Sequence, residues 1–214
     1  ANLGLEHWRR HGTGSWVGLA PHDAHPEPET LALLLSAAEG QDRAGLVSAD
    51  VGDDMSPVID RYFGGILQPA STTSGWEDVD HPHGTLLLLA RGLLEEVGGF
   101  DERYSSYCEE ADLALRARAA GWRIGLVRGA RVTNRHLSGD VALVDYLQVR
   151  NTLLLVRDHF GCYPATIRLL MVLGQTVSGV ARPERRPPVF DARARLHAVA
   201  DHLRGRYGPP PDLG

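Results

Sequence analysis

The hydrophobic positions of this chain form short strand-like runs and longer helix-like runs, which alternate up to about residue 138. The clearest run is 84–90, where four consecutive leucines follow Gly84 and Thr85, as is typical of a strand covered on both faces. Further strands are predicted at 16–20, 44–50, 64–67, 122–127 and 130–133, and helices at 29–39, 91–97 and 109–120. Strands that alternate with helices in this way predict an α/β fold.

Beyond Gly139 the pattern becomes helical throughout. Helices are predicted at about 140–159, 163–181 and 190–206. The segment 182–188 holds three prolines and three arginines, a composition typical of a linker. We therefore expect a core at residues 1–138, followed by a helical appendage at 139–214.

Composition excludes several classes of protein. Hydrophobic residues make up 43% of the 214 residues and charged residues 23%, which is enough apolar material for a packed core and argues against wholesale disorder. Two cysteines exclude a disulfide framework and a cysteine-rich zinc site. No apolar run reaches the roughly 18 residues of a membrane span, and no basic-then-apolar leader opens the sequence, so we expect a cytoplasmic protein.

Charge is divided unevenly along the chain. Residues 1–114 carry 6 arginines and 20 acids, whereas residues 115–214 carry 16 arginines and 7 acids, giving a net charge of −5. We expect no nucleic-acid partner. The basic C-terminal helices suggest peripheral contact with an anionic membrane at the inner face of the plasma membrane. A helical bundle that packs on the core, or forms a homodimer, explains the same pattern.

Asp23 is the first candidate for chemistry, because it follows the predicted strand 16–20. A carboxylate at the carboxyl end of a strand is well placed to hold Mg²⁺ or Mn²⁺, which prefer oxygen ligands and commonly also coordinate substrate phosphates. Taken alone, Asp23 is equally explained as a loop residue that caps the following helix.

Three acids, Glu109, Glu110 and Asp112, open the helix predicted at 109–120. Glu109 and Asp112 are three residues apart and share a helix face, while Glu110 points elsewhere. One of these carboxylates could act as a general base that takes a proton from an attacking hydroxyl. Stabilisation by the helix dipole explains the same cluster without any function.

Histidines and one arginine supply weaker signals. His136 follows a predicted strand and could ligate a metal through a neutral ring nitrogen. The pairs His22/His25 and His81/His83 suggest a zinc hydrolase, but they lack the helical i, i+4 spacing with an adjacent Glu. Arg150 lies in an apolar helix, where it could reach a phosphate or a partner or simply extend to solvent.

The order of these motifs is more specific than any one of them. Five motifs follow one another along the chain. They are a glycine-led strand at Gly84–Arg91, a GGFDE turn within Val97–Glu102, an acidic motif that opens a helix at Tyr107–Leu113, a Gly-Trp pair at Gly121–Trp122 and a late histidine, His136. Together they resemble the family 2 glycosyltransferases, most closely the bacterial rhamnosyltransferase-like members. The resemblance extends over most of residues 1–160, because it also includes Asn2-Leu3-Gly4, the stretch from Trp16 to Leu31 and the stretch from Tyr146 to Asn151.

This resemblance implies a GT-A fold, which is a Rossmann-like mixed sheet, here followed by the helical segment. It also implies transfer of a sugar, with inversion, from a nucleotide diphosphate sugar to a hydroxyl acceptor. The acceptor would be a glycan, a lipid-linked glycan or a small molecule, in cell-envelope or natural-product biosynthesis. By position, Asp23 and His136 would hold a divalent cation, Mg²⁺ or Mn²⁺, that bridges to the donor diphosphate. Glu110 would be the catalytic base.

The resemblance also implies the substrate contacts. Gly84 and Thr85 would lie under the acceptor or the donor sugar, and Glu109 and Asp112 would shape the acceptor pocket. Arg150 belongs to the family's helix that carries an Arg-Asn pair, and it is the remaining candidate for substrate binding.

The sequence departs from the family pattern in three ways, and the first two favour a second hypothesis, a non-catalytic binding or scaffold module. No residue before Asn2 supplies the family's first strand, which belongs to its N-terminal nucleotide-binding half. We therefore expect either a truncated piece of a longer chain or a protein that has lost donor binding. His22 stands where a second acid is common, which lowers the charge available to Mg²⁺. Glu110 replaces the usual Asp and lengthens the base by one methylene.

Overall fold

The computed structural model describes residues 1–134 and 140–211, which divide into two compact units. The first, here called the core unit, comprises residues 1–59, 66–100 and 110–137. The second, the helical unit, comprises 60–65, 101–109 and 138–214. The sequence predicts one boundary near residue 138, whereas the helical unit also includes two earlier segments of the chain.

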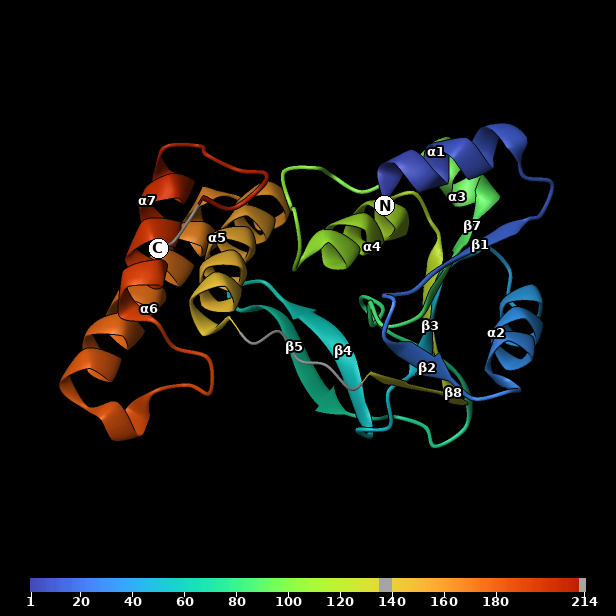
Figure 1. The fold of residues 1–214 in the computed structure, drawn as a ribbon, viewed down its shortest axis with the longest axis horizontal. Coiled ribbons are helices and arrows are strands. Elements are labelled where there is room, and N and C mark those ends of the chain that lie inside the picture. The colour runs from blue at the N-terminus through green and yellow to red at the C-terminus, as the bar shows by residue number, and fades with distance from the viewer. Residues whose placement is uncertain (135–139, 212–214) are drawn as a thin grey trace. The chain divides into compact units, whose positions relative to one another are not determined.

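A mixed six-stranded sheet forms the centre of the core unit (Figure 1). Its strands are β1 (Trp16–Leu19), β7 (Leu87–Ala90), β3 (Ala44–Asp50), β8 (Arg123–Asn134) and β2 (Ala24–Pro26) in spatial order, with β6 (Gly75–Asp78) also paired to β8. The central pair, β3 and β8, is parallel, and the other pairs are antiparallel. Two further strands, β4 (Met55–Asp60) and β5 (Gly64–Pro69), form a separate small sheet.

Helices cover both faces of the large sheet, which explains its uninterrupted apolar runs. Every residue of β3 and β7 is buried. Successive side chains of a strand point to opposite faces, so Leu89 packs in a cluster with α3 (Arg91–Glu96) and α4 (Glu109–Ala119). Leu88 packs in a second cluster with Leu34 of α2 (Thr30–Glu39).

The predicted strands at 122–127 and 130–133 are one continuous strand, β8. Gly129 has a φ of 87°, a conformation that glycine adopts at little cost, and it marks a bulge. Across this bulge the register with β3 jumps, since Ala49 is opposite Val127 but Asp50 is opposite Arg131. The predicted strand at 84–90 is shorter than expected, because the strand begins only at Leu87.

Several elements lie where the sequence predicts none. The helix α1 (Asn2–His11) buries only Leu5 and therefore shows no apolar face with a helical period. The strands β2, β4 and β6 are three to six residues long, too short for an alternating pattern to stand out.

In the helical unit, α5 (Val141–Phe160), α6 (Cys162–Ala181) and α7 (Ala192–Leu203) match the predicted helices. Gly161, with a φ of 91°, separates the first two. The predicted linker contains a short 3-10 turn at Pro183–Arg185. Within the described residues, no helix combines the length and the hydropathy that a membrane-crossing segment needs.

A buried ion network holds the bulged strand β8 to its surroundings. The Arg128 guanidinium donates to Glu77 at 2.6 Å and to Ser56 Oγ at 2.9 Å, and it lies 3.5 Å from Asp50. Burial opposes ionisation of Glu77, but hydrogen bonds from Ser56, Ser71 and Arg128 outweigh it and lower its pKa to about 2. This charged cluster ties four segments of the core unit together.

Replacing Arg128 by Met should therefore leave the buried Glu77 carboxylate without its cation and leave Asp50 with Arg131 alone, at 3.4 Å. We expect the free energy of unfolding to fall by about 3–5 kcal/mol, measured by urea denaturation. Arg123→Met is the matched control, because its ion pair with Asp78 is exposed and should be worth less than about 1 kcal/mol. Equal losses in the two variants would contradict a role for burial.

Candidate functional site

The carboxyl ends of β1, β3 and β8 meet at one edge of the large sheet. Leu19 at the end of β1 is opposite Leu87, the first residue of β7, so the chain that follows β1 and the chain that precedes β7 reach the same edge. The backbone N–H of Ala49, near the end of β3, donates to the Leu86 carbonyl at this edge. Loops that enter and leave these strands therefore bring residues distant in sequence close together.

Gly84 and Glu110 are the two predicted site residues that the structure packs directly against each other. A Cβ atom built on Gly84 would lie 3.1 Å from Cδ of Glu110 and would collide with one of its carboxylate oxygens. The absence of a side chain at Gly84 thus makes the space that the Glu110 carboxyl group occupies.

Burial raises the pKa of Glu110, and a hydrogen bond from its own backbone N–H only partly offsets the effect. A carboxylate with a raised pKa is a stronger base than an exposed one. When deprotonated, such a group can accept a proton from a hydroxyl at near-neutral pH. The geometry therefore gives Glu110 the properties that a general base needs.

Asp23 lies in the turn between β1 and β2, half-buried, with the Ala24 N–H closing the turn onto the Pro21 carbonyl at 3.1 Å. Its neighbour Ala24 is opposite Asn134, the last residue of β8. Asp23 thus stands at the edge where the sheet strands end, and its role as a metal ligand remains a prediction. His136, the second predicted ligand, lies outside the described residues.

The described side chains suit a divalent cation only if the substrate supplies further ligands. Among the described residues, no three His, Cys, Asp or Glu side chains form a group that could hold a metal ion unaided. Mg²⁺ and related hard cations are commonly held by one or two carboxylates together with substrate phosphates. A single half-buried carboxylate, Asp23, fits that kind of shared site.

His83 immediately precedes Gly84 and was not singled out as a site residue. Burial lowers its pKa, with Asp53 opposing and Arg128 adding to the effect. Burial also lowers the pKa of His81, to about 4. The Nε2 atoms of both rings are buried and have no hydrogen-bond partner among the described residues. The sequence shows the pair His81/His83, but it carries no signal that these rings are buried.

Of the other predicted substrate contacts, Thr85 is half-buried beside Gly84, and Glu109 opens α4. Asp112 is 3% exposed and binds Arg116 at 2.9 Å, and that arginine also donates to the carbonyls of Val97 and Gly99. Asp112 therefore anchors the turn at 97–99 to α4, and we leave it out of the proposed substrate contacts.

Arg150 also has a structural role, within the helical unit. It is 1% exposed and donates to Asn151 Oδ1 at 3.0 Å, to the Tyr146 hydroxyl and to the Gly208 carbonyl. Asn151 in turn donates to the carbonyls of Ser106 and Tyr107, at 2.7 and 3.0 Å.

The loop that Asn151 holds leads into the acidic motif. Tyr107 and Cys108 both have positive φ angles, 66° and 73°, which are costly for residues other than glycine. The two hydrogen bonds from Asn151 help to keep this strained loop in place just before Glu109. The Arg-Asn pair is evident in the sequence, but this positioning role of Asn151 is not.

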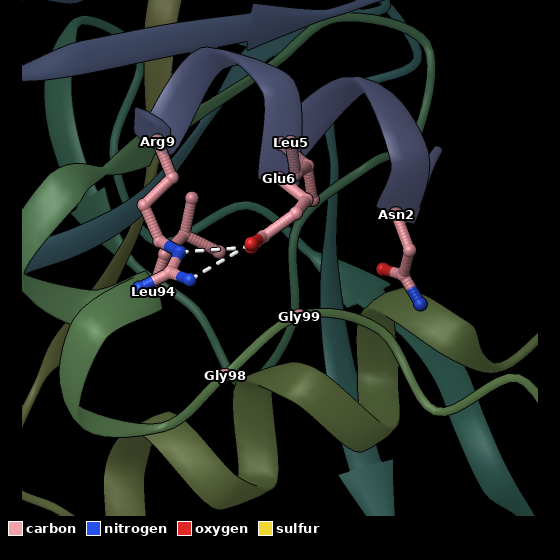
Figure 2. A pocket seen from close by; sticks show the side chains of 7 residues that line it. All are labelled: Asn2, Leu5, Glu6, Arg9, Leu94, Gly98 and Gly99. Atoms are coloured by element: carbon pink, nitrogen blue, oxygen red, sulfur yellow. Dashed lines mark hydrogen bonds and ion pairs between the residues drawn. The ribbon is translucent and has the colours of Figure 1, made fainter. Parts of the chain in front are cut away.

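A hollow of about 290 Å³ lies elsewhere in the core unit, between α1 and the turn that follows α3 (Figure 2). Its lining includes Asn2, Glu6, Arg9 and Gly99. Glu6 and Arg9 bind each other at 2.9 Å, and the Asn2 amide pairs with the backbone of Phe100. None of the predicted site residues lines this hollow, and its charged side chains already have partners.

Comparison with known proteins identifies relatives. No protein-family model matches the chain. The chain is 30% identical, over 180 residues, to an N-acetylglucosaminyl-diphospho-decaprenol L-rhamnosyltransferase found in two strains of Mycobacterium tuberculosis. The aligned region covers 72% of this chain and 59% of those relatives, so the chain spans less than two thirds of their length.

Two solved structures share the fold. The mannosyltransferase PcManGT from Pyrobaculum calidifontis, in complex with GDP-Man and Mn²⁺, superposes with a TM-score of 0.55 at 15% identity, over 96% of this chain and 67% of that one. The structure of GalNAc-T7 with UDP, GalNAc and Mn²⁺ superposes with a TM-score of 0.53 at 15% identity, over 94% of this chain and 40% of that one. The predicted GT-A fold and the resemblance to rhamnosyltransferase-like glycosyltransferases are confirmed.

Gly84→Ala tests whether the missing side chain keeps the Glu110 carboxyl group buried. The new methyl group should displace the flexible end of Glu110, so the pKa of Glu110 should fall toward the ordinary value of a glutamate. Carboxyl carbon NMR titration measures this, with Glu110→Gln to assign the signal.

Gly14→Ala is the matched control, since a Cβ there meets no atom closer than 3.5 Å. An unchanged titration of Glu110 in Gly84→Ala would show that the glycine does not set the environment of this carboxyl group.

Proposed function

We propose that the protein is a metal-dependent, inverting glycosyltransferase of the hexosyltransferase type. It would move a sugar from a nucleotide diphosphate donor to a hydroxyl acceptor in envelope glycan or natural-product biosynthesis. The observation that carries the proposal is the half-buried Glu110, whose carboxyl group packs against Gly84 at the sheet edge that also bears Asp23. The relationship to a rhamnosyltransferase, and a fold shared with mannosyl- and GalNAc-transferases, support the class of reaction.

In the proposed reaction, the acceptor hydroxyl lies beside Glu110 and gives its proton to the carboxylate. The hydroxyl oxygen forms a bond to the anomeric carbon as the bond from that carbon to the diphosphate oxygen breaks. The electron pair of the broken bond leaves with the nucleoside diphosphate, and the anomeric configuration inverts. Because the pKa of Glu110 is raised, its carboxylate is a better proton acceptor than an exposed one.

Asp23 would hold the divalent cation together with the donor diphosphate. A bound Mg²⁺ or Mn²⁺ supplies positive charge that offsets the charge developing on the leaving diphosphate. The two solved structures that share the fold both contain Mn²⁺ and a nucleotide, which supports this assignment. His136 remains the predicted second ligand.

The remaining contacts of the proposed site come from the edge itself. Gly84 and Thr85 would lie under the acceptor or the sugar, and Glu109 would border the acceptor. By its name, the curated relative acts on a lipid diphosphate acceptor, N-acetylglucosaminyl-diphospho-decaprenol. We therefore favour a lipid-linked glycan acceptor, reached from the cytoplasmic face of the membrane.

Glu110→Gln keeps the size of the side chain but removes the base. Sugar transfer by the full-length protein with Mn²⁺ and a panel of nucleotide sugars should fall roughly 10²–10⁴-fold in kcat, with little change in the KM for the donor. Glu110→Asp should retain part of the activity, because aspartate keeps the carboxylate. Glu95→Gln, at an exposed position on α3, is the control. Full activity in Glu110→Gln would remove Glu110 from the reaction.

Asp23→Asn removes the proposed metal-binding charge. Calorimetry with UDP, GDP and dTDP should detect binding of at least one nucleotide by the full-length protein, dependent on Mn²⁺. In Asp23→Asn this Mn²⁺ dependence should disappear. Absence of binding by all three nucleotides would contradict the proposal. It would favour the alternative, a non-catalytic binding or scaffold module. The exposed His22, at a position where an acid is expected, agrees with that alternative.

A further inference from the structure

Helix α6 of the helical unit exposes a long apolar face. Tyr163, Leu170 and Val177 are 70%, 63% and 69% exposed and are spaced seven residues apart, which places them on one side of the helix. Val180, 58% exposed, lies close to the C-terminal end. Exposed fractions this high show that no described part of the protein covers these side chains.

This face carries no charge. Arg168 is the only charged residue among the twenty of α6, and its guanidinium lies 5.8 Å from the centre of the Phe63 ring. Burial lowers the pKa of Arg168, which agrees with a side chain turned toward the protein. By contrast, α1 exposes Glu6 and Arg9, as a helix facing water normally does.

The opposite side of α6 is already in use. Val172, Thr176 and Gly179 are buried, and α6 packs against both α5 and α7. The exposed face is therefore a separate surface and not a part of the bundle core that has been left open. Large uncharged surfaces of this kind mark sites of protein or membrane contact.

Positive charge gathers at the end of this face. Arg182 and Arg185 follow α6 directly and are exposed, and Arg186 is held near the helix end by its hydrogen bond to the Gly179 carbonyl at 2.9 Å. Glu184 is the only acid in this stretch. A partner that suits the surface must accept apolar side chains and also present negative charge.

We propose that the exposed face of α6 docks on the surface of an anionic lipid membrane. Tyr163, Leu170 and Val177 enter the boundary between headgroups and acyl chains, while Arg182 and Arg185 contact the anionic headgroups. A second copy of the chain fits less well, because the same face on another molecule offers the arginines no acid except Glu184. The sequence suggests membrane contact through the basic C-terminal helices as a group, and this proposal assigns the contact to one uncharged face of α6 and the arginines that follow it.

Vesicle flotation tests the proposal without any sugar donor or acceptor, so its outcome is independent of the proposed enzymatic activity. The full-length protein is mixed with vesicles of phosphatidylcholine alone, or of phosphatidylcholine with 30% phosphatidylglycerol. We expect flotation with the anionic vesicles that weakens as NaCl is raised, and at least tenfold weaker partition to the neutral vesicles.

Two variants separate the apolar and charged contributions. Leu170→Gln/Val177→Gln should lower the partition coefficient roughly tenfold or more, because two apolar anchors are lost. Arg182→Gln/Arg185→Gln should reduce binding to anionic vesicles and weaken its salt dependence. Leu3→Gln, which replaces an even more exposed leucine on α1, is the control and should bind as the parent protein does. Circular dichroism establishes that each variant is folded.

Several results would overturn the proposal. One is an absence of flotation with anionic vesicles, and another is equal flotation of the parent protein and Leu170→Gln/Val177→Gln. A third is a parent protein that is dimeric by light scattering and a Leu170→Gln/Val177→Gln variant that is monomeric, because this would assign the face to a second copy of the chain.

Discussion

The proposed chemistry depends on one steric constraint, the lack of a side chain at Gly84. Without a Cβ at this position, the Glu110 carboxyl group can lie directly against the backbone of Gly84. Burial then raises its pKa, since a charged carboxylate is poorly solvated there. An exposed glutamate at the start of α4 would be a weaker base stabilised by the helix dipole, so the proposed role of Glu110 as a base depends on this glycine.

The fold supplies the rest of the arrangement. The parallel pair of β3 and β8 directs two strand ends to the same edge, and the antiparallel pairing of β1 with β7 brings the residues after Leu19 and before Leu87 to that edge. The bulge at Gly129 changes the register, and the buried ion network around Arg128 holds the bulged strand in place. In the helical unit, Asn151 holds the strained loop that leads into the acidic motif. Stability and site geometry are thus coupled through a few buried polar residues.

Much of the fold could be predicted from the sequence because its central elements are strongly apolar. The fully buried β3, the helix α4 and the three C-terminal helices follow directly from their patterns. The helix α1 could not be predicted, because it buries only one leucine, and the short strands β2 and β6 depend on pairing with β8.

For the candidate site, motif order predicts Glu110, Gly84 and Asp23, and their roles remain proposals. The i, i+4 spacing of Asp112 and Arg116 and the Arg150-Asn151 pair are visible in the sequence. The backbone carbonyls that Arg116, Arg150 and Asn151 bind become evident only in three dimensions. The pair His81/His83 is visible in the sequence, but the burial that lowers the pKa of both rings is not.

The pH dependence of kcat/KM for sugar transfer tests the central claim most directly. A base must be deprotonated to act, and burial raises the pKa of Glu110, so activity should rise with pH along a limb centred above the ordinary glutamate value of about 4.3. This limb should move to lower pH in Gly84→Ala. A limb at the ordinary glutamate value, or one that Gly84→Ala leaves in place, would contradict the account.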